Sequence, residues 1–189
     1  MFLSLLKFIQ ENFNPNVAAF IELISVAYQG ISKFNEIAIT PKEALGVWGD
    51  GNLGFITALF LKEKFPDSKV MVFGKHMDNL NLFSFADEVY PIHNVPDDLA
   101  VDHAFECVGS SASQSAIDQI IDLINPQGTI NLFGVSEYPI PINTRMVLEK
   151  GLTIQGNSRS EREDFEGVVE TLKQNPILFE YLEKLVTNI

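Results

Sequence analysis

Three glycines at a fixed spacing carry the strongest chemical signal in the chain. Gly49, Gly51 and Gly54 form the pattern G-x-G-x-x-G, directly after the apolar run 44–48 and directly before a helical pattern. In this context the first glycine allows a tight turn, the second lets the backbone approach a pyrophosphate, and the third lets the helix pack closely. Free N–H groups at the helix start would bind the phosphates. The sequence therefore predicts a dinucleotide cradle; a plain strand-to-helix turn is the alternative.

The end of the next predicted strand bears on which dinucleotide would bind. An Asp or Glu about 20 residues after the glycines would bind the ribose 2′-OH of NAD. This chain instead has Gly74, Lys75 and His76 at that place. A small residue removes repulsion, and two potentially cationic side chains can attract a 2′-phosphate. The pattern favours NADP(H); an exposed turn with a chance lysine is the alternative, and nearby Asp78 keeps NAD open.

The elements that must position these residues alternate between strands and helices along the chain. Such alternation indicates right-handed crossovers on one parallel sheet. We therefore predict an α/β fold, a doubly wound six-stranded parallel Rossmann sheet with helices on both faces. Residues 1–35 would form a helical segment packed on the sheet, and residues 36–189 the NADP-binding domain. Strands are predicted over 44–48, 69–73, 88–92, 101–105, 129–133 and 152–155, and helices over 17–34, 52–64, 77–85, 112–124, 143–150, 161–174 and after residue 176.

Composition excludes several classes of function. The chain has 189 residues, about one domain, and its 46% apolar content is enough to bury a core. A formal charge of −12 argues against non-specific nucleic-acid binding and a polybasic membrane anchor. The single cysteine cannot form an intramolecular disulfide and favours a reducing, cytoplasmic location. Residues 1–10 lack the basic start of a secretory signal; we interpret them as the edge of a packed domain or a remnant of something longer.

Candidate metal ligands and nucleophiles are sparse. His103 and Cys107 resemble a ligand pair, but four residues of a strand span about 13 Å, which excludes joint binding of one zinc ion. The sequence contains no H-E-x-x-H, C-x-x-C or nucleophile elbow. We therefore expect a cofactor cradle without catalytic machinery of its own.

Longer runs resemble a known superfamily. VWGDGNLG, ADEVYPI, DHAFECVGS and PQGTINLFGVSEY are similar to segments in the nucleotide-binding domain of zinc-dependent medium-chain dehydrogenases, the alcohol dehydrogenase superfamily. LFSFADEVY, DDLAVDHAFECVG, INTRMVLEKGL and GNSRSEREDFE resemble bacterial ribulose-5-phosphate reductases, also called ribitol-5-phosphate dehydrogenases. The resemblance implies an oxidoreductase that uses NADPH to make ribitol 5-phosphate for CDP-ribitol, teichoic-acid or capsule synthesis. In that family hydride is transferred at a zinc-polarised carbonyl.

The resemblance also implies roles for individual residues, among them a carboxylate at the catalytic zinc. Glu22 lies in a run similar to the Glu-x-x-Ser-Val stretch of polyol dehydrogenases, where the Glu binds zinc or its water; an exposed helix position is the alternative. The other zinc ligands belong to an N-terminal lobe that we expect this chain to lack, so the full-length parent would be the enzyme. The implied cofactor contacts are Gly49, Gly51, Asn52, Leu53 and Gly54 at the pyrophosphate, Gly74, Lys75 and His76 at the 2′-phosphate, Cys107, Val108 and Gly109 at the ribose, Gly134, Val135 and Ser136 at the nicotinamide, and Ser158 and Arg159 closing over the cofactor.

Partners follow from the same resemblance. The substrate would be a polyol or ketose phosphate, a cytidylyltransferase would act in the same pathway, and edge strand 152–155 would pair in a homodimer. Two other hypotheses remain: an NAD-dependent sorbitol-type dehydrogenase domain, and a non-catalytic nucleotide-binding or dimerisation module. Fold alone does not separate these three.

Overall fold

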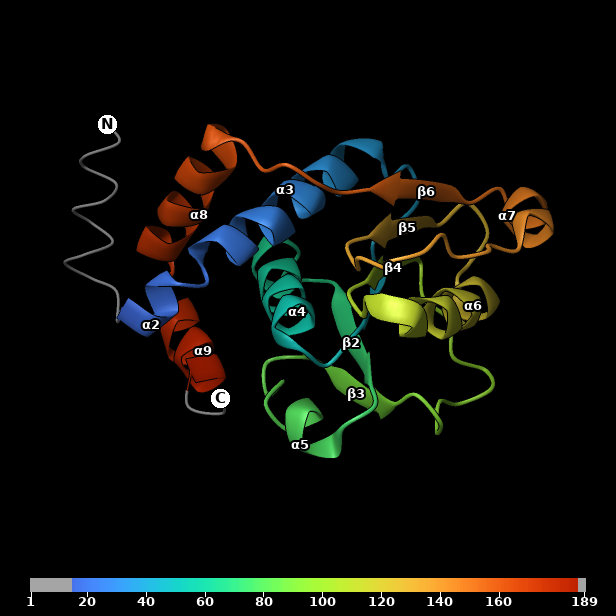
Figure 1. Cartoon of the computed structure of the whole chain (residues 1–189), viewed down its shortest axis with the longest axis horizontal. Coiled ribbons are helices and arrows are strands. Elements are labelled where there is room, and N and C mark those ends of the chain that lie inside the picture. The colour runs from blue at the N-terminus through green and yellow to red at the C-terminus, as the bar shows by residue number, and fades with distance from the viewer. Residues whose placement is uncertain (1–14, 187–189) are drawn as a thin grey trace.

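Six parallel strands form a sheet in the order β3-β2-β1-β4-β5-β6. The computed structural model describes residues 15–186. β3 and β6 lie at opposite edges of the sheet (Figure 1). The strand order makes β1 and β4 the central neighbours. This arrangement confirms the predicted doubly wound fold. The strands are β1 (Ala44–Trp48), β2 (Lys69–Gly74), β3 (Glu88–Pro91), β4 (His103–Glu106), β5 (Thr129–Leu132) and β6 (Thr153–Gly156).

Helices cover both faces of the sheet. One apolar core joins the sheet to α3, α4, α8 and α9, and the other joins it to α6 and α7. Figure 1 shows α2, α8 and α9 gathered at one end of the molecule and α7 at the other. The helices are α2 (Pro15–Ala18), α3 (Ile21–Ile37), α4 (Asn52–Lys64), α5 (Met77–Leu80), α6 (Ser113–Leu123), α7 (Thr144–Lys150), α8 (Arg162–Gln174) and α9 (Ile177–Val186), with a 3₁₀ turn η1 (Ser110–Ala112) before α6.

The sequence of β2 explains why this interior strand is covered on both faces. Val70 and Val72 belong to the core beneath α3 and α4, whereas Met71 and Phe73 belong to the core beneath α6. Successive side chains of a strand point to opposite faces, and a parallel strand covered on both faces must be apolar throughout. The continuous apolar run therefore buries the strand on both sides.

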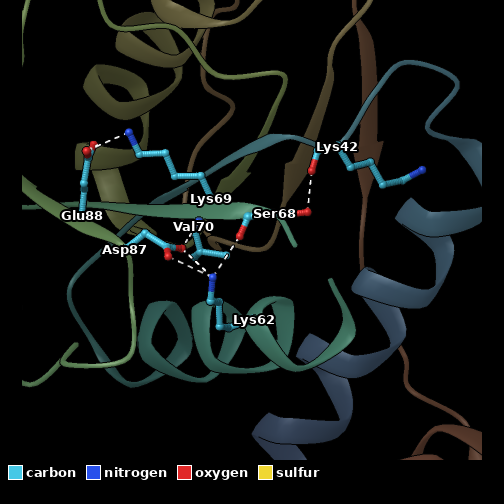
Figure 2. A network of polar contacts seen from close by, with 7 residues as sticks. All are labelled: Lys42, Lys62, Ser68, Lys69, Val70, Asp87 and Glu88. Atoms are coloured by element: carbon cyan, nitrogen blue, oxygen red, sulfur yellow. Dashed lines mark hydrogen bonds and ion pairs between the residues drawn. The ribbon is translucent and has the colours of Figure 1, made fainter. Parts of the chain in front are cut away.

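A network of polar contacts lies at the amino-terminal ends of the strands (Figure 2). Lys62 of α4 donates to the carbonyl of Ser68 at 3.1 Å and to the Asp87 carboxylate at 2.8 Å. Asp87 also accepts the N–H of Val70 at 2.7 Å, and the Ser68 hydroxyl donates to the carbonyl of Lys42. The network therefore joins α4 to the chain entering β1, β2 and β3.

Element boundaries differ from the sequence predictions in a few places. α3 begins at Ile21 and continues through Gly30 to Ile37. A Cβ on Gly30 would lie 2.2 Å from the Phe133 ring, so close packing explains this glycine inside a helix. The fourth strand begins two residues later than predicted, because Val101 forms only an isolated bridge. The sixth strand is shifted by one residue, to Thr153–Gly156.

The helix predicted over 77–85 is a single turn, α5, since the chain leaves helical geometry after Leu80. Residues 1–14 of the predicted N-terminal segment lie outside the described residues. Within residues 15–186 no helix is both long and apolar enough to cross a membrane.

Candidate cofactor-binding site

A cavity of about 630 Å³ opens at the carboxyl ends of β1, β2 and β4. In doubly wound sheets ligands bind at the carboxyl ends of the strands. The binding crevice lies between the two central strands, where the strand order reverses. A smaller cavity of about 180 Å³ lies between α3, α4 and α8, away from the strand ends. The larger cavity is lined by residues 48–51 and 73–76, by Ile92, Cys107 and Val108, and by Ala112, Ser115, Ala116 and Gln119.

The three motif glycines have different surroundings at this edge. Gly49 has a φ of 131°, and a Cβ there would lie 2.9 Å from the carbonyl of Cys107. A Cβ on Gly54 would lie 1.9 Å from the carbonyl oxygen of Gly49, so the first turn of α4 packs directly on the loop after β1. No atom of the described residues lies within 4 Å of a Cβ built on Gly51, which lines the cavity. The loop is thus tightly packed beneath the cavity and open toward it.

The Asp50 carboxylate organises the turn after β2. Its Oδ2 accepts N–H bonds from Lys75 at 2.8 Å and His76 at 2.5 Å, and lies 3.2 Å from His76 Nδ1. A Cβ on Gly74 would lie 2.6 Å from the Asp50 Cβ, so this approach requires glycine. The exposed Lys75 and His76 line the cavity. Sequence reasoning assigned Asp50 no role, although its place inside the glycine motif was a signal.

Two aromatic side chains at the ends of β1 and β2 pack behind the cavity, and each is only 1% exposed. The rings of Trp48 and Phe73 stack with centroids 4.0 Å apart. Trp48 Nε1 donates to the Gln119 side chain at 2.8 Å, and Gln119 donates to the carbonyl of Ile92 at 2.9 Å. These residues were not among the predicted site residues. Only their positions in the sequence could have indicated them. Trp48 and Phe73 lie at the ends of strands, and Gln119 lies in a helix that follows a strand.

Cys107 lies at the base of the cavity as a protonated thiol. Its Sγ lies 3.6 Å from the Thr57 hydroxyl, and burial raises the thiol pKa to about 12. A thiol acts as a nucleophile or metal ligand through its thiolate. Cys107 therefore contributes a small apolar surface to the site.

His103 lies at the other end of β4, away from the cavity. It is fully buried, its Nδ1 accepts the N–H of Thr129 at 3.1 Å, and its Nε2 lies 3.0 Å from the carbonyl of Pro41. Because His103 and Cys107 stand at opposite ends of the strand, they cannot share a metal ion. Within residues 15–186 no group of three or more His, Cys, Asp or Glu could hold one.

The remaining predicted site residues lie outside the cavity lining. Glu22 is exposed on α3. Ser158 and Arg159 are exposed, and the carbonyl of Arg159 accepts a bond from Gln29 on α3 at 2.6 Å. Other predicted contacts flank the cavity: Asn52, Leu53 and Gly54 in the first turn of α4, Gly109 after β4, and Gly134, Val135 and Ser136 after β5. Thus the structure brings Gly49, Gly51, Gly74, Lys75, His76, Cys107 and Val108 together around one cavity.

Comparisons with known proteins agree with this geometry. The chain is 54% identical over 176 residues to ribulose-5-phosphate reductase of Bacillus spizizenii, which covers 93% of this chain and 52% of the relative. It is 49% identical to ribulose-5-phosphate reductase 2 of Staphylococcus aureus, over 88% of this chain and 49% of the relative. The chain therefore spans about half the length of the curated relatives it matches.

A solved structure is similarly close. The crystal structure of S. aureus TarJ in complex with NADPH superposes with a TM-score of 0.87 at 48% identity, covering 92% of this chain and 55% of that one. Residues 76–174 match the family model described as zinc-binding dehydrogenase. These residues make up more than half of the chain, which therefore belongs to the zinc-binding dehydrogenase family.

Proposed function

We propose that this chain is the NADP(H)-binding domain of an enzyme that reduces ribulose 5-phosphate to ribitol 5-phosphate. The observation that carries the proposal is the convergence of Gly51, Lys75 and His76 on one cavity at the strand ends. Reductases 54% and 49% identical to this chain support the substrate, and the NADPH complex of TarJ supports the cofactor.

The cavity suits a phosphorylated dinucleotide. Open space over Gly51 leaves room for a pyrophosphate beside the first turn of α4, whose leading N–H groups have no acceptor within the helix. Lys75 and His76 present positive or protonatable groups on the β2 side of that point. These residues would bind and orient the cofactor, whose nicotinamide supplies the hydride.

The described residues do not by themselves form a zinc site. Glu22 is part of the proposal as one carboxylate near the zinc of the complete enzyme, and its exposure on α3 leaves it free to face another domain. The remaining ligands would come from residues beyond those described. Teichoic-acid or capsule synthesis, a cytidylyltransferase in the same pathway and a cytoplasmic location belong to the same proposal, and rest on the sequence similarity.

The binding test is a fluorescence titration of the chain with NADPH and with NADH at fixed salt. We expect tighter binding of NADPH, and a loss of about tenfold in NADPH affinity for Lys75→Ala, because a cation beside a phosphate is removed. The matched control is Lys64→Ala, an exposed lysine of α4 that lines the smaller cavity. Preference for NADH would favour a sorbitol-type dehydrogenase domain, and binding of neither would favour a non-catalytic dimerisation module.

A homodimer through β6 completes the proposal. Thr153 and Asn157 donate their N–H groups to Gly128 and Leu132 on the β5 side, so by alternation the N–H of Ile154 points to the free edge. An unpaired edge is a template for pairing with another strand. Large apolar side chains at Val135, Tyr138 and Leu148 are exposed in the segments flanking β5 and β6.

Sedimentation of Ile154→Pro tests the dimer. Proline removes the outward N–H while leaving the bonds to β5 in place, so we expect a shift from dimer to monomer. Ile154→Val keeps the N–H and should sediment like the parent chain. A parent chain that sediments as a monomer would contradict the dimer without affecting the cofactor proposal.

A further inference from the structure

Glu106 is a carboxylate buried at the end of β4, with only 1% of its surface exposed. Its Oε1 accepts N–H bonds from Val108 at 2.9 Å and Gly109 at 3.2 Å. Its Oε2 accepts the N–H of Gly134 at 3.1 Å, and the Glu106 backbone carbonyl shares that N–H at 3.1 Å. One side chain therefore binds both the loop that follows β4 and the loop that follows β5.

Two glycines make this arrangement possible. Gly109 adopts a φ of +71°, which L side chains rarely adopt. A Cβ on Gly134 would lie 2.5 Å from the Glu106 carboxylate and 2.5 Å from the Gly109 nitrogen. Glu106, Gly109 and Gly134 thus depend on one another, and we call them the Glu106 bracket.

The hydrogen bonds of the Glu106 bracket compensate for the burial of its carboxylate. A buried carboxylate costs free energy unless hydrogen-bond donors surround it. All three of these donors are backbone N–H groups of two loops, so the carboxylate fixes loop geometry. The N–H of Ser110 donates to the carbonyl of Val135 at 2.8 Å and adds a second connection between the same loops.

The strand order places the bracket beside one half of the proposed cofactor. Phosphate at Gly51 and 2′-phosphate at Lys75 and His76 would put the adenosine half on the β2 side of β1. The other half must then extend across β1 toward β4 and β5, whose loops the bracket holds. Val108, bound directly by Glu106, lines the cavity on this side.

We propose that Glu106 is a positioning residue that holds the loops after β4 and β5 for the nicotinamide half of the dinucleotide. It acts through Val108, Gly109 and Gly134. This inference rests on the proposed function, because it assumes a dinucleotide in this cavity.

The test compares two ligands on the Glu106→Gln variant. The amide can accept bonds at one oxygen only, so either the Val108 and Gly109 N–H groups lose their acceptor or the Gly134 N–H keeps only its bond to the Glu106 backbone carbonyl. We expect NADPH affinity to fall about tenfold and the affinity for adenosine 2′,5′-bisphosphate, which lacks the nicotinamide half, to change less than about twofold. Glu36→Gln, an exposed substitution on α3, is the matched control. Equal losses for both ligands would overturn the proposal, because they would indicate general loss of structure.

Amide hydrogen exchange without cofactor gives an independent readout. We expect slow exchange at Val108, Gly109 and Gly134, and faster exchange there in Glu106→Gln, with the β1–β2 ladder unchanged. If Glu106→Gln fails to fold, Gly134→Ala tests the same bracket through its added Cβ and should give the same ligand pattern. Rapid exchange at the three amides of the parent chain would overturn the proposal even if NADPH binds. Protected amides in a chain that binds neither ligand would instead refute the proposed function, and the positioning role with it.

Discussion

The Asp50 carboxylate lies against the backbone N–H of His76, with Oδ2 and nitrogen 2.5 Å apart. The same oxygen accepts the N–H of Lys75. In NAD-binding sheets an acid at the end of the second strand binds the ribose. Here that position is Gly74, and the acid reaches the same place from the loop after β1. A negative charge thus already occupies the N–H groups nearest the proposed 2′-phosphate site.

Removing this charge should strengthen the preference for NADPH. Asn at position 50 can still accept the two N–H bonds through its side-chain oxygen, so the turn should persist. Because the carboxylate would repel a 2′-phosphate, we expect Asp50→Asn to raise NADPH affinity about fivefold, on the order of 1 kcal/mol, with little change for NADH. Paired titrations measure the ratio. Asp78→Asn, which removes an exposed charge on α5, is the control. A fall in NADPH affinity would mean that the charge of Asp50 supports binding.

Alanine substitution should destabilise the fold at Gly54 and leave its stability nearly unchanged at Gly51. Gly54→Ala places a Cβ 1.9 Å from the carbonyl of Gly49, so we expect a destabilisation of about 1–3 kcal/mol. Gly51→Ala places its Cβ in open space, and the Gly51 φ of −88° suits alanine, so stability should change by less than about 0.5 kcal/mol. That Cβ would nevertheless occupy the space assigned to the pyrophosphate. Denaturant unfolding combined with NADPH titration separates the two effects; unchanged affinity in Gly51→Ala would place the phosphates elsewhere.

The sequence predicts the central part of the sheet best. β1 was predicted residue for residue and α4 likewise, because a strand covered on both faces is a continuous apolar run and the glycine motif marks where the helix starts. The peripheral elements were less accurate. α5 ends early because Leu80 and Phe83 turn into the core, a tertiary contact that local periodicity does not encode.

The residues of the site likewise differ in how well the sequence predicts them. The glycine turn and the Lys75–His76 turn are local patterns, so spacing alone identified them. Asp50 and Glu106 were not assigned, because each bonds to a loop that follows another strand: Asp50 binds the turn after β2, and Glu106 binds Gly134, 28 residues away, in addition to its near neighbours in sequence. Such contacts follow only from the strand order, which places β1 beside β2 and β4 beside β5.

His103 should make stability fall in mild acid. Burial lowers its pKa, outweighing the hydrogen bonds to Pro41 and Thr40 that favour protonation. The unfolded chain, with a pKa near 6.5, therefore takes up a proton before the folded one, and the free energy of unfolding decreases as pH falls through 6.5. We expect unfolding between pH 7.5 and 5.5 to show a smaller pH slope for His103→Gln than for the parent chain. His93→Gln, at an exposed position, should keep the parent slope. Equal slopes in all three proteins would assign the effect to other groups.

The network in Figure 2 should stabilise the fold through Lys62 more than through Lys69. Lys62 joins α4 to Asp87 and to the carbonyl of Ser68. Among residues 15–186 Lys69 pairs with Glu88 alone, at 2.7 Å, and it is the more exposed of the two lysines. We expect Lys62→Met to cost about 1 kcal/mol and Lys69→Met less than about 0.5 kcal/mol in urea unfolding at pH 7. Equal costs would mean that the bonds from Lys62 to Ser68 and Asp87 add nothing beyond an exposed ion pair.

The cost of losing Lys62 should also depend on pH. Burial tends to raise the pKa of Asp87, but the bonds from Lys62 and the Val70 N–H lower it below 3.8. The ionised carboxylate therefore stabilises the folded state above about pH 3.8, and this contribution is lost as pH falls through the lower folded-state pKa. The difference between the parent chain and Lys62→Met should shrink between pH 5 and pH 3, because protonated Asp87 no longer attracts the ammonium group. A difference that stays constant over this range would assign the role of Lys62 to its bond with Ser68 alone.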